Sequence, residues 1–211
     1  IVMLMKLGKH KRDDFYMSYN TNFSTLTYKK THIFDIWDKF QNVYVSISVE
    51  GVGKKGEIIR NGFKWDKFVT NVKKFNEKFK DRKDTHELNF DCTVQAMNVL
   101  EVTNLHQTLF NLGLMQDIDR LHLNYLHGPE ELAVWILDKK TKEEAKKNIR
   151  DHIDNFLIPN GSKESVDEYE SLIKFIDLHQ RQNLIPNFVK KTLSLDLLRN
   201  ENTAKEFPEL R

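Results

Sequence analysis

Cysteine is almost absent from this chain, whose 211 residues include only Cys92. A single thiol excludes a disulfide within the chain, and it excludes a metal site ligated by several cysteines of the same chain. This usage predicts a reducing compartment, so we expect a cytoplasmic protein. Cys92 stands between Asp91 and Thr93 in a predicted strand, where a buried, unreactive thiol is far commoner than a nucleophile.

Long apolar runs are also lacking. No stretch of about 18 apolar residues occurs, so no membrane-spanning helix is expected. The N-terminus has no signal-peptide pattern, which argues against export. The sequence therefore predicts neither a membrane partner nor a secreted protein.

An excess of charge of one sign is missing as well. Lysine and arginine total 33 against 31 acidic residues, which leaves a net charge of +2. The basic clusters at 9–12 and 139–142 are short and lie near acidic residues, as solvated surfaces usually do. A nucleic-acid partner would need a contiguous basic face, and the mixed charges do not predict one.

Several catalytic motifs do not occur. The chain has no P-loop, no Gly-x-Ser-x-Gly elbow and no His-Glu-x-x-His pair, which removes support for most familiar hydrolase and kinase chemistries. Asp117 and Asp119 could form a pair of catalytic carboxylates, but their position in a loop favours turn and capping roles.

Strand and helix patterns alternate over residues 15–127. Strands are predicted at 15–20, 42–50, 88–95 and 121–126, and helices at 31–40, 64–80 and 102–112. This order predicts an α/β fold with a parallel sheet and helices outside it. After Pro129 a further strand is possible at 132–137, followed by helices at 141–156, 163–179 and 187–199. We expect one main domain and a mainly helical C-terminal extension.

The stretch 42–60 is the most informative one. Apolar and hydroxyl-bearing residues alternate up to residue 49, and glycines follow at positions 51, 53 and 56. Such glycines let the backbone pass close to a ligand. The strand end places Ser48 and Glu50 near Arg60, a common way to build a ligand site in α/β proteins.

Polar residues also follow the other predicted strands. They are Asn20, Thr21 and Asn22 after the first, Gln95 and Asn98 after the third, and Asn124 and His127 after the fourth. The carboxyl ends of parallel strands meet at one edge of a sheet, so we expect one polar rim. His122 and Asn124 share a face, but a third metal ligand is missing, so substrate or packing roles are favoured.

Motifs in the same order resemble a known family. They are Tyr-Asn-Thr-Asn at 19–22, Ile-Ser-Val-Glu-Gly at 47–51, Ile-Ile-Arg at 58–60, Asp-Cys-Thr-Val-Gln-Ala-Met-Asn at 91–98, Leu-His-Leu-Asn at 121–124 with Pro129, Leu-Asp-Leu-Leu-Arg at 195–199 and Phe-Pro-Glu-Leu at 207–210. Together they resemble radical S-adenosylmethionine enzymes of the twitch type. The resemblance covers nearly the whole chain.

The resemblance implies a partial (β/α)6 barrel over residues 1–128, with its first two βα units missing, and a twitch-like helical extension over 129–211. It implies S-adenosylmethionine and a [4Fe–4S] cluster as cofactors, an electron donor, and hydrogen abstraction by a 5′-deoxyadenosyl radical from a peptide or small molecule. Ser48 and Arg60 would hold the methionyl carboxylate. Asn22, Glu50 and Asn98 would lie beside cofactor or substrate, Gln95 would flank the adenosine, and Thr93, His122 and Asn124 would face the substrate.

The chain departs from this family in two ways. The Cys-x3-Cys-x2-Cys loop that ligates the cluster and the Gly-Gly-Glu-Pro stretch that receives the cofactor amino group are both missing. Position 23 is Phe where glycine is usual, and position 50 is Glu where aspartate is usual. We therefore expect no cluster, no metal ligand and no catalytic residue in this chain itself.

The apolar opening at residues 1–7 is expected to be the tail of a helix whose beginning lies upstream. The chain would then be the C-terminal two-thirds of an enzyme. The alternative is a non-catalytic α/β module in which the same polar rim binds a nucleotide or a partner protein.

Overall fold

The structure, a computed structural model, describes residues 16–210. The strands are β1 (Tyr16–Thr21), β2 (Thr27–Tyr28), β3 (Thr31–His32), β4 (Asn42–Ser48), β5 (His86–Val94) and β6 (Leu121–Tyr125). The α-helices are α2 (Ile33–Trp37), α3 (Gly53–Ile59), α4 (Trp65–Lys78), α5 (Val102–Asn111), α6 (Lys139–His152), α7 (Glu164–Ile176), α8 (Ile185–Arg199) and α9 (Thr203–Glu206). A π-helical turn, Ile153–Leu157, extends α6.

Four strands form one parallel sheet in the order β1-β4-β5-β6, and β2 and β3 form a separate antiparallel hairpin. The predicted α/β class and parallel sheet are confirmed, because β1 pairs in parallel with β4, β4 with β5, and β5 with β6. Within residues 16–210 this sheet is open. A (β/α)6 barrel is therefore not seen, and that part of the expectation stays a prediction.

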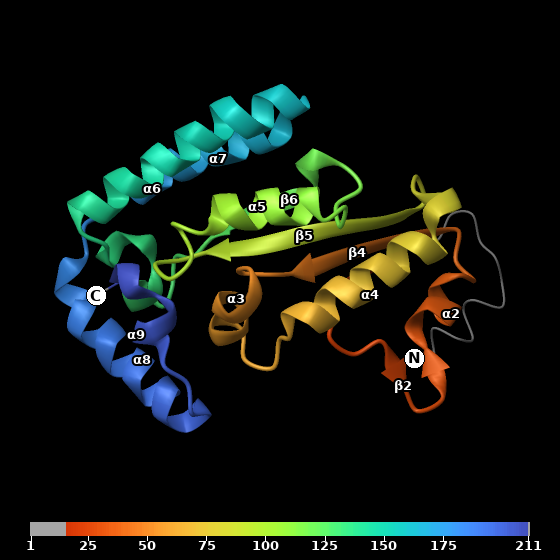
Figure 1. The fold of residues 1–211 in the computed structure, drawn as a ribbon, viewed down its shortest axis with the longest axis horizontal. Coiled ribbons are helices and arrows are strands. Elements are labelled where there is room, and N and C mark those ends of the chain that lie inside the picture. The colour runs from red at the N-terminus through yellow and green to blue at the C-terminus, as the bar shows by residue number, and fades with distance from the viewer. Residues whose placement is uncertain (1–15, 211) are drawn as a thin grey trace.

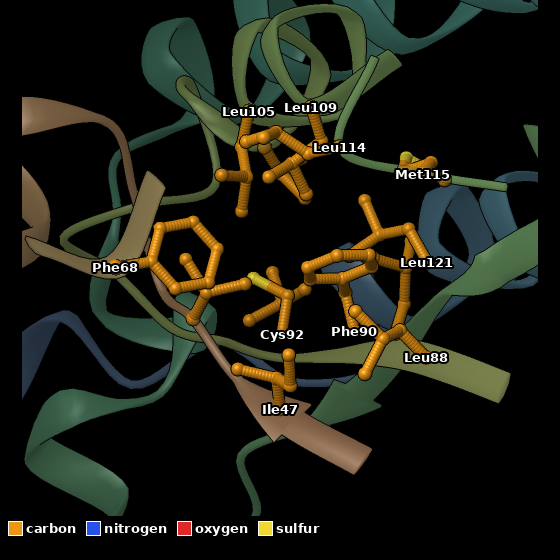
Figure 2. Close-up of a cluster of buried hydrophobic side chains, with 14 of the residues drawn as sticks. Ile47, Phe68, Leu88, Phe90, Cys92, Leu105, Leu109, Leu114, Met115 and Leu121 are labelled. Carbon is orange, nitrogen blue, oxygen red and sulfur yellow. The ribbon is translucent and has the colours of Figure 1, made fainter. Parts of the chain in front are cut away.

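One face of the sheet carries the core. Figure 2 shows Ile47 of β4 together with Leu88, Phe90 and Cys92 of β5, all pointing toward side chains of α4 and α5. Phe68 of α4 meets the Phe90 ring edge-on, with ring centroids 6.1 Å apart. Apolar and polar residues alternate along these strands, so the apolar side chains all lie on the face that α4 and α5 cover. The opposite face keeps the polar side chains.

The C-terminal helices continue from the β6 side of the sheet, where α6 and α7 run together as a pair (Figure 1). Glu168 of α7 accepts a hydrogen bond from the Leu123 backbone N–H at 2.8 Å, and its carbonyl accepts one from the Tyr125 hydroxyl at 2.8 Å. All three predicted C-terminal helices are present. The predicted division at residue 128 stays a prediction.

One predicted element is wrong, and another is shorter than predicted. Residues 132–137 are not a strand but end one short 3-10 turn and contain a second, Val134–Ile136. Trp135 is buried there and its indole N–H donates to the Phe175 carbonyl at 3.2 Å, so packing against α7 accounts for the apolar run. Residues 31–40 contain only a five-residue helix, since Thr31 and His32 pair with the β2 strand.

Among the described residues, no helix is both long and apolar enough to cross a membrane. The helix tail expected at residues 1–7 lies outside the described residues, as does Phe15.

Candidate cofactor-binding site

The loop after β4 turns tightly into α3. Gly53 has a φ of +56°, a conformation that glycine adopts without strain. At Gly56 a Cβ atom would lie 2.2 Å from the carbonyl oxygen of Gly51, so only glycine fits this approach. These two glycines bring the end of α3 back beside the end of β4.

Arg60, which ends α3, forms a two-pronged ion pair with Glu50. Its Nε lies 2.6 Å from Glu50 Oε2, and its Nη2 lies 2.6 Å from Oε1. The Glu50 side chain is 5% exposed and that of Arg60 is 33% exposed. The hydrogen bond to Glu50 raises the pKa of Arg60, so the guanidinium stays charged. The sequence prediction that these two residues meet is confirmed.

Ser48 is the last residue of β4 and is half-buried. Its backbone neighbour across the sheet is Asp91 of β5. Among the described residues its hydroxyl has no hydrogen-bonding partner, and no hydrogen bond joins it to Arg60. The hydroxyl therefore remains able to bind a ligand at the end of the strand, and its predicted role stays a prediction.

Asn98 connects the loops that follow β4 and β5. It is fully buried, and its amide nitrogen donates to the carbonyl oxygens of Glu50 and Thr93, each at 3.0 Å. Its Oδ1 accepts a hydrogen bond from the Gln95 backbone N–H at 2.8 Å. Every polar atom of the Asn98 amide forms a hydrogen bond within the chain. In this structure Asn98 therefore holds the two loops together.

Gln95 lines a cavity of about 280 Å³ at the carboxyl ends of the strands. One wall is apolar and includes Ile58, Met97 and Leu126, while α8 contributes Asp196 and Arg199. Arg199 donates to the Ile58 carbonyl at 3.2 Å, which links α8 to α3. The cavity combines an apolar wall with a charged one, as small-molecule sites commonly do.

Asn22 follows β1 and is exposed, and its Oδ1 accepts a hydrogen bond from the Ser24 N–H at 3.1 Å. Phe23 has a φ of +54°, in the left-handed region that glycine favours. The Phe23 ring is buried beside Trp37, with ring centroids 6.2 Å apart, and its carbonyl accepts from Asn71. Aromatic packing thus holds a non-glycine residue in this conformation.

The three candidate substrate residues lie on the polar face of the sheet. Thr93 is the register partner of Asn124, and Asp91 is that of His122. His122 Nδ1 lies 3.1 Å from Glu168 Oε1, and the hydrogen bond to this carboxylate raises the pKa of His122. Asn124 is exposed and Thr93 is half-buried. The structure brings these residues together on one surface.

Cys92 lies on the other face, fully buried among apolar side chains (Figure 2). Burial raises the pKa of its thiol far above the ordinary value. Within residues 16–210, no three His, Cys, Asp or Glu side chains are grouped so that they could hold a metal ion.

Sequence reasoning missed several residues of this region. Glu168 anchors His122 from a helix 46 positions away in sequence, and Asp196 and Arg199 reach the rim from α8. The periodic pattern predicted a helix at 187–199, and the family resemblance included the stretch 195–199, but neither signal placed this helix beside the ends of the strands.

Comparison with protein-family models, with curated proteins and with solved structures gives no match for this chain.

Proposed function

We propose that this chain is the C-terminal, cofactor-binding portion of a radical S-adenosylmethionine enzyme. The observation that carries the proposal is the position of the Arg60 guanidinium. Glu50 holds it just beyond the end of β4, the strand whose last residue is Ser48. A guanidinium and a hydroxyl at one strand end are suited to an amino-acid carboxylate.

The residues present fit the methionyl part of the cofactor. A guanidinium has five N–H donors, and Glu50 engages one at Nε and one at Nη2. The remaining donors belong to a side chain that is one-third exposed. The left-handed backbone at Phe23 also supports the resemblance, since the family usually has glycine there.

The residues present do not fit the iron–sulfur cluster. Cluster iron needs several thiolates, whereas this chain has one thiol, in the core on the face away from Ser48. In the proposed parent enzyme, the cluster ligands come from outside these 211 residues. A cluster bound there would supply the electron for reductive cleavage of the cofactor, and the substrate would be a peptide or a small molecule. No step of that reaction is assigned to a residue of this chain.

Calorimetric titration with two ligands tests the proposal. S-adenosylmethionine carries the carboxylate, and 5′-methylthioadenosine lacks the whole amino-acid part. We expect the former to bind about tenfold or more tightly, because a charge-assisted hydrogen bond contributes roughly 1.5–3 kcal/mol.

The variants must separate binding from folding, because Arg60→Ala alone would leave Glu50 buried and unpaired. The double variant Arg60→Ala/Glu50→Gln removes both charges, and Glu50→Gln is its matched control. The preference for S-adenosylmethionine should disappear in the double variant and persist in the control. Equal affinity of the wild-type chain for both ligands would sink the proposal.

The alternative is a non-catalytic module that binds a nucleotide or a partner protein. The shortage of cysteine favours it, since a nucleotide site needs no cluster. In that case 5′-methylthioadenosine or another nucleoside would bind as well as the full cofactor.

A further inference from the structure

Two of the eight glycines in this chain follow an asparagine, in the pairs Asn61-Gly62 and Asn160-Gly161. In such a pair the backbone nitrogen of the glycine can attack the side-chain amide carbon of the asparagine. Glycine favours this attack because it has no Cβ to shield the nitrogen and its backbone rotates with little restriction. All four residues are exposed, so exposure does not distinguish the two pairs. Their hydrogen bonds do.

The first pair lies in the loop that joins α3 to α4 (Figure 1). The Phe63 N–H donates to the Arg60 carbonyl at 3.1 Å, so Asn61 and Gly62 are the two central residues of a four-residue turn. Gly62 has a φ of +82°, and a Cβ atom added to it would meet nothing within 4 Å. The space around the attacking nitrogen is therefore open.

Both groups that would react in this turn are without hydrogen bonds. Within residues 16–210, the peptide group between Asn61 and Gly62 forms no hydrogen bond, and neither does the Asn61 side chain. The peptide group can therefore rotate toward the side-chain amide without the loss of a hydrogen bond. The Gly62 nitrogen and the Asn61 amide carbon are thus available to each other in the folded chain.

The second pair is held by two hydrogen bonds. The Asn160 amide nitrogen donates to the Phe156 carbonyl at 2.8 Å. The Gly161 N–H, which belongs to the attacking nitrogen, donates to the Ile158 carbonyl at 3.0 Å. Both bonds must break before the nitrogen can reach the amide carbon, and breaking them costs free energy. The structure therefore distinguishes two pairs that the sequence makes equivalent.

We propose that Asn61 is a site of spontaneous deamidation in the folded chain. The Gly62 nitrogen forms a bond to Asn61 Cγ, and the side-chain nitrogen leaves as ammonia, taking the proton that the Gly62 nitrogen gives up. The product is a cyclic imide. Water then opens the ring at either of its carbonyl groups, which leaves aspartate or isoaspartate at position 61.

This modification changes the charge beside the candidate cofactor site. Either product adds a negative charge directly after Arg60 in the chain, and isoaspartate also lengthens the backbone there by one carbon atom. The inference goes beyond the proposed function, because deamidation requires only water and does not require S-adenosylmethionine to bind.

Mass spectrometry of the ageing chain tests the proposal. The folded chain is kept at mildly alkaline pH in water enriched in ¹⁸O and is then digested in ordinary water. The peptide that contains Asn61 should acquire an acid with one ¹⁸O atom, and electron-transfer fragmentation should detect isoaspartate in part of it. We expect Asn61 to convert about tenfold or more faster than Asn160, because Asn160 must first lose two hydrogen bonds.

Two controls connect the result to the structure. In concentrated urea both pairs lose their surroundings, so Asn61 and Asn160 should convert at similar rates. Asn61→Gln keeps an exposed amide but would have to form a larger ring, so position 61 should stay an amide in this variant. Asn160 in the variant should convert as it does in the wild-type chain.

Two results would overturn the inference. One is conversion of Asn160 in the folded chain at the same rate as Asn61 or faster. The other is an Asn61 that stays an amide in the folded chain over a period in which the unfolded chain converts it completely. Neither result bears on the cofactor site, which the calorimetric titration tests separately.

Discussion

At the scale of single residues, the main feature of the candidate site is the ion pair of Glu50 and Arg60, just beyond the end of β4. Its two hydrogen bonds are both 2.6 Å, and the carboxylate has little access to water. A buried ion pair contributes little net stability by itself, because desolvation offsets the attraction. Removing one partner is different, since the other charge is then left buried and unpaired.

Arg60→Ala should therefore destabilise the chain by roughly 3–5 kcal/mol, the usual cost of breaking a buried pair from one side. Arg60→Ala/Glu50→Gln should recover much of that loss because no charge remains buried. Urea unfolding of the two variants measures the difference. If the single and double variants unfold at the same urea concentration, Glu50 is not held by Arg60 as described.

Gly56 supports the same corner through its backbone. Gly56→Ala should destabilise the chain by about 1–3 kcal/mol or more, because the added Cβ collides with the Gly51 carbonyl, a backbone group that cannot rotate away. Lys54→Ala in the same helix is the control, since that side chain is exposed and should cost almost nothing. Thermal unfolding followed by circular dichroism compares them, and equal midpoints would contradict the close approach.

The rim residues were predictable where they follow a strand directly. Glu50 and Arg60 are close in sequence, and the glycines between them indicated the turn. Glu168 was not predictable, because it reaches His122 through the tertiary packing of α7.

At the scale of elements, a chain of hydrogen bonds joins α5 to α6. Gln107 Nε2 lies 3.1 Å from His152 Nδ1, His152 Nε2 lies 3.4 Å from His106 Nδ1, and His106 Nε2 lies 2.8 Å from the Ile118 carbonyl. A carbonyl only accepts, so His106 Nε2 carries the proton and each remaining bond has one donor and one acceptor. This arrangement requires both histidines to be neutral.

Burial lowers the pKa of His106 to about 4 and that of His152 to about 3. Unfolded histidines titrate near pH 6.5, so the unfolded chain binds more protons below that pH. The packing of α5 on α6 should therefore be fully stable above about pH 6.5 and lose stability as the pH falls toward 4. The loss should be on the order of 3 kcal/mol for one histidine.

Urea unfolding at a series of pH values checks this dependence. His152→Gln keeps polar atoms at the position but cannot titrate, so its stability should fall less between pH 6.5 and 4. His127→Gln, an exposed histidine outside the chain of hydrogen bonds, is the control and should behave as the wild type. A wild-type stability that is flat over this range would contradict the neutral pair.

The type of an element was predicted correctly where its periodic pattern of apolar residues was strong. Helices α4 and α5 have apolar residues every three to four positions, and their positions were predicted to within two residues. Residues 132–137 are a continuous apolar run, and such a run fits a buried strand or a buried turn equally well. The turn is fixed by the contacts of Trp135 with Phe175 and His179. These two residues lie about 40 positions further along the sequence.

At the scale of the whole molecule, a parallel sheet is covered by α4 and α5 on one face and carries polar residues on the other (Figure 1). Parallel sheets usually have both faces covered. Alternation along the chain predicted a parallel sheet with helices outside it, but not whether the sheet closes, since closure depends on pairing at the outer edges. In a barrel of this kind, the polar face would line the interior.

Anaerobic reconstitution with iron and sulfide should leave the isolated chain without a cluster, because Cys92 is buried and no other thiol is present. Iron and acid-labile sulfide analysis after gel filtration measures this. Stoichiometric incorporation of both, with the absorbance of a [4Fe–4S] cluster, would contradict the assignment of the ligands to other residues.

The most direct test of the proposed function is the side-chain Nε–H signal of Arg60 in the ¹⁵N-labelled chain during titration with S-adenosylmethionine. A carboxylate that binds the guanidinium should shift this signal in a saturable way, and 5′-methylthioadenosine at equal occupancy should leave it in place. An Arg60 signal that stays unchanged with S-adenosylmethionine, or moves equally with both ligands, would contradict a role of Arg60 in holding the methionyl carboxylate.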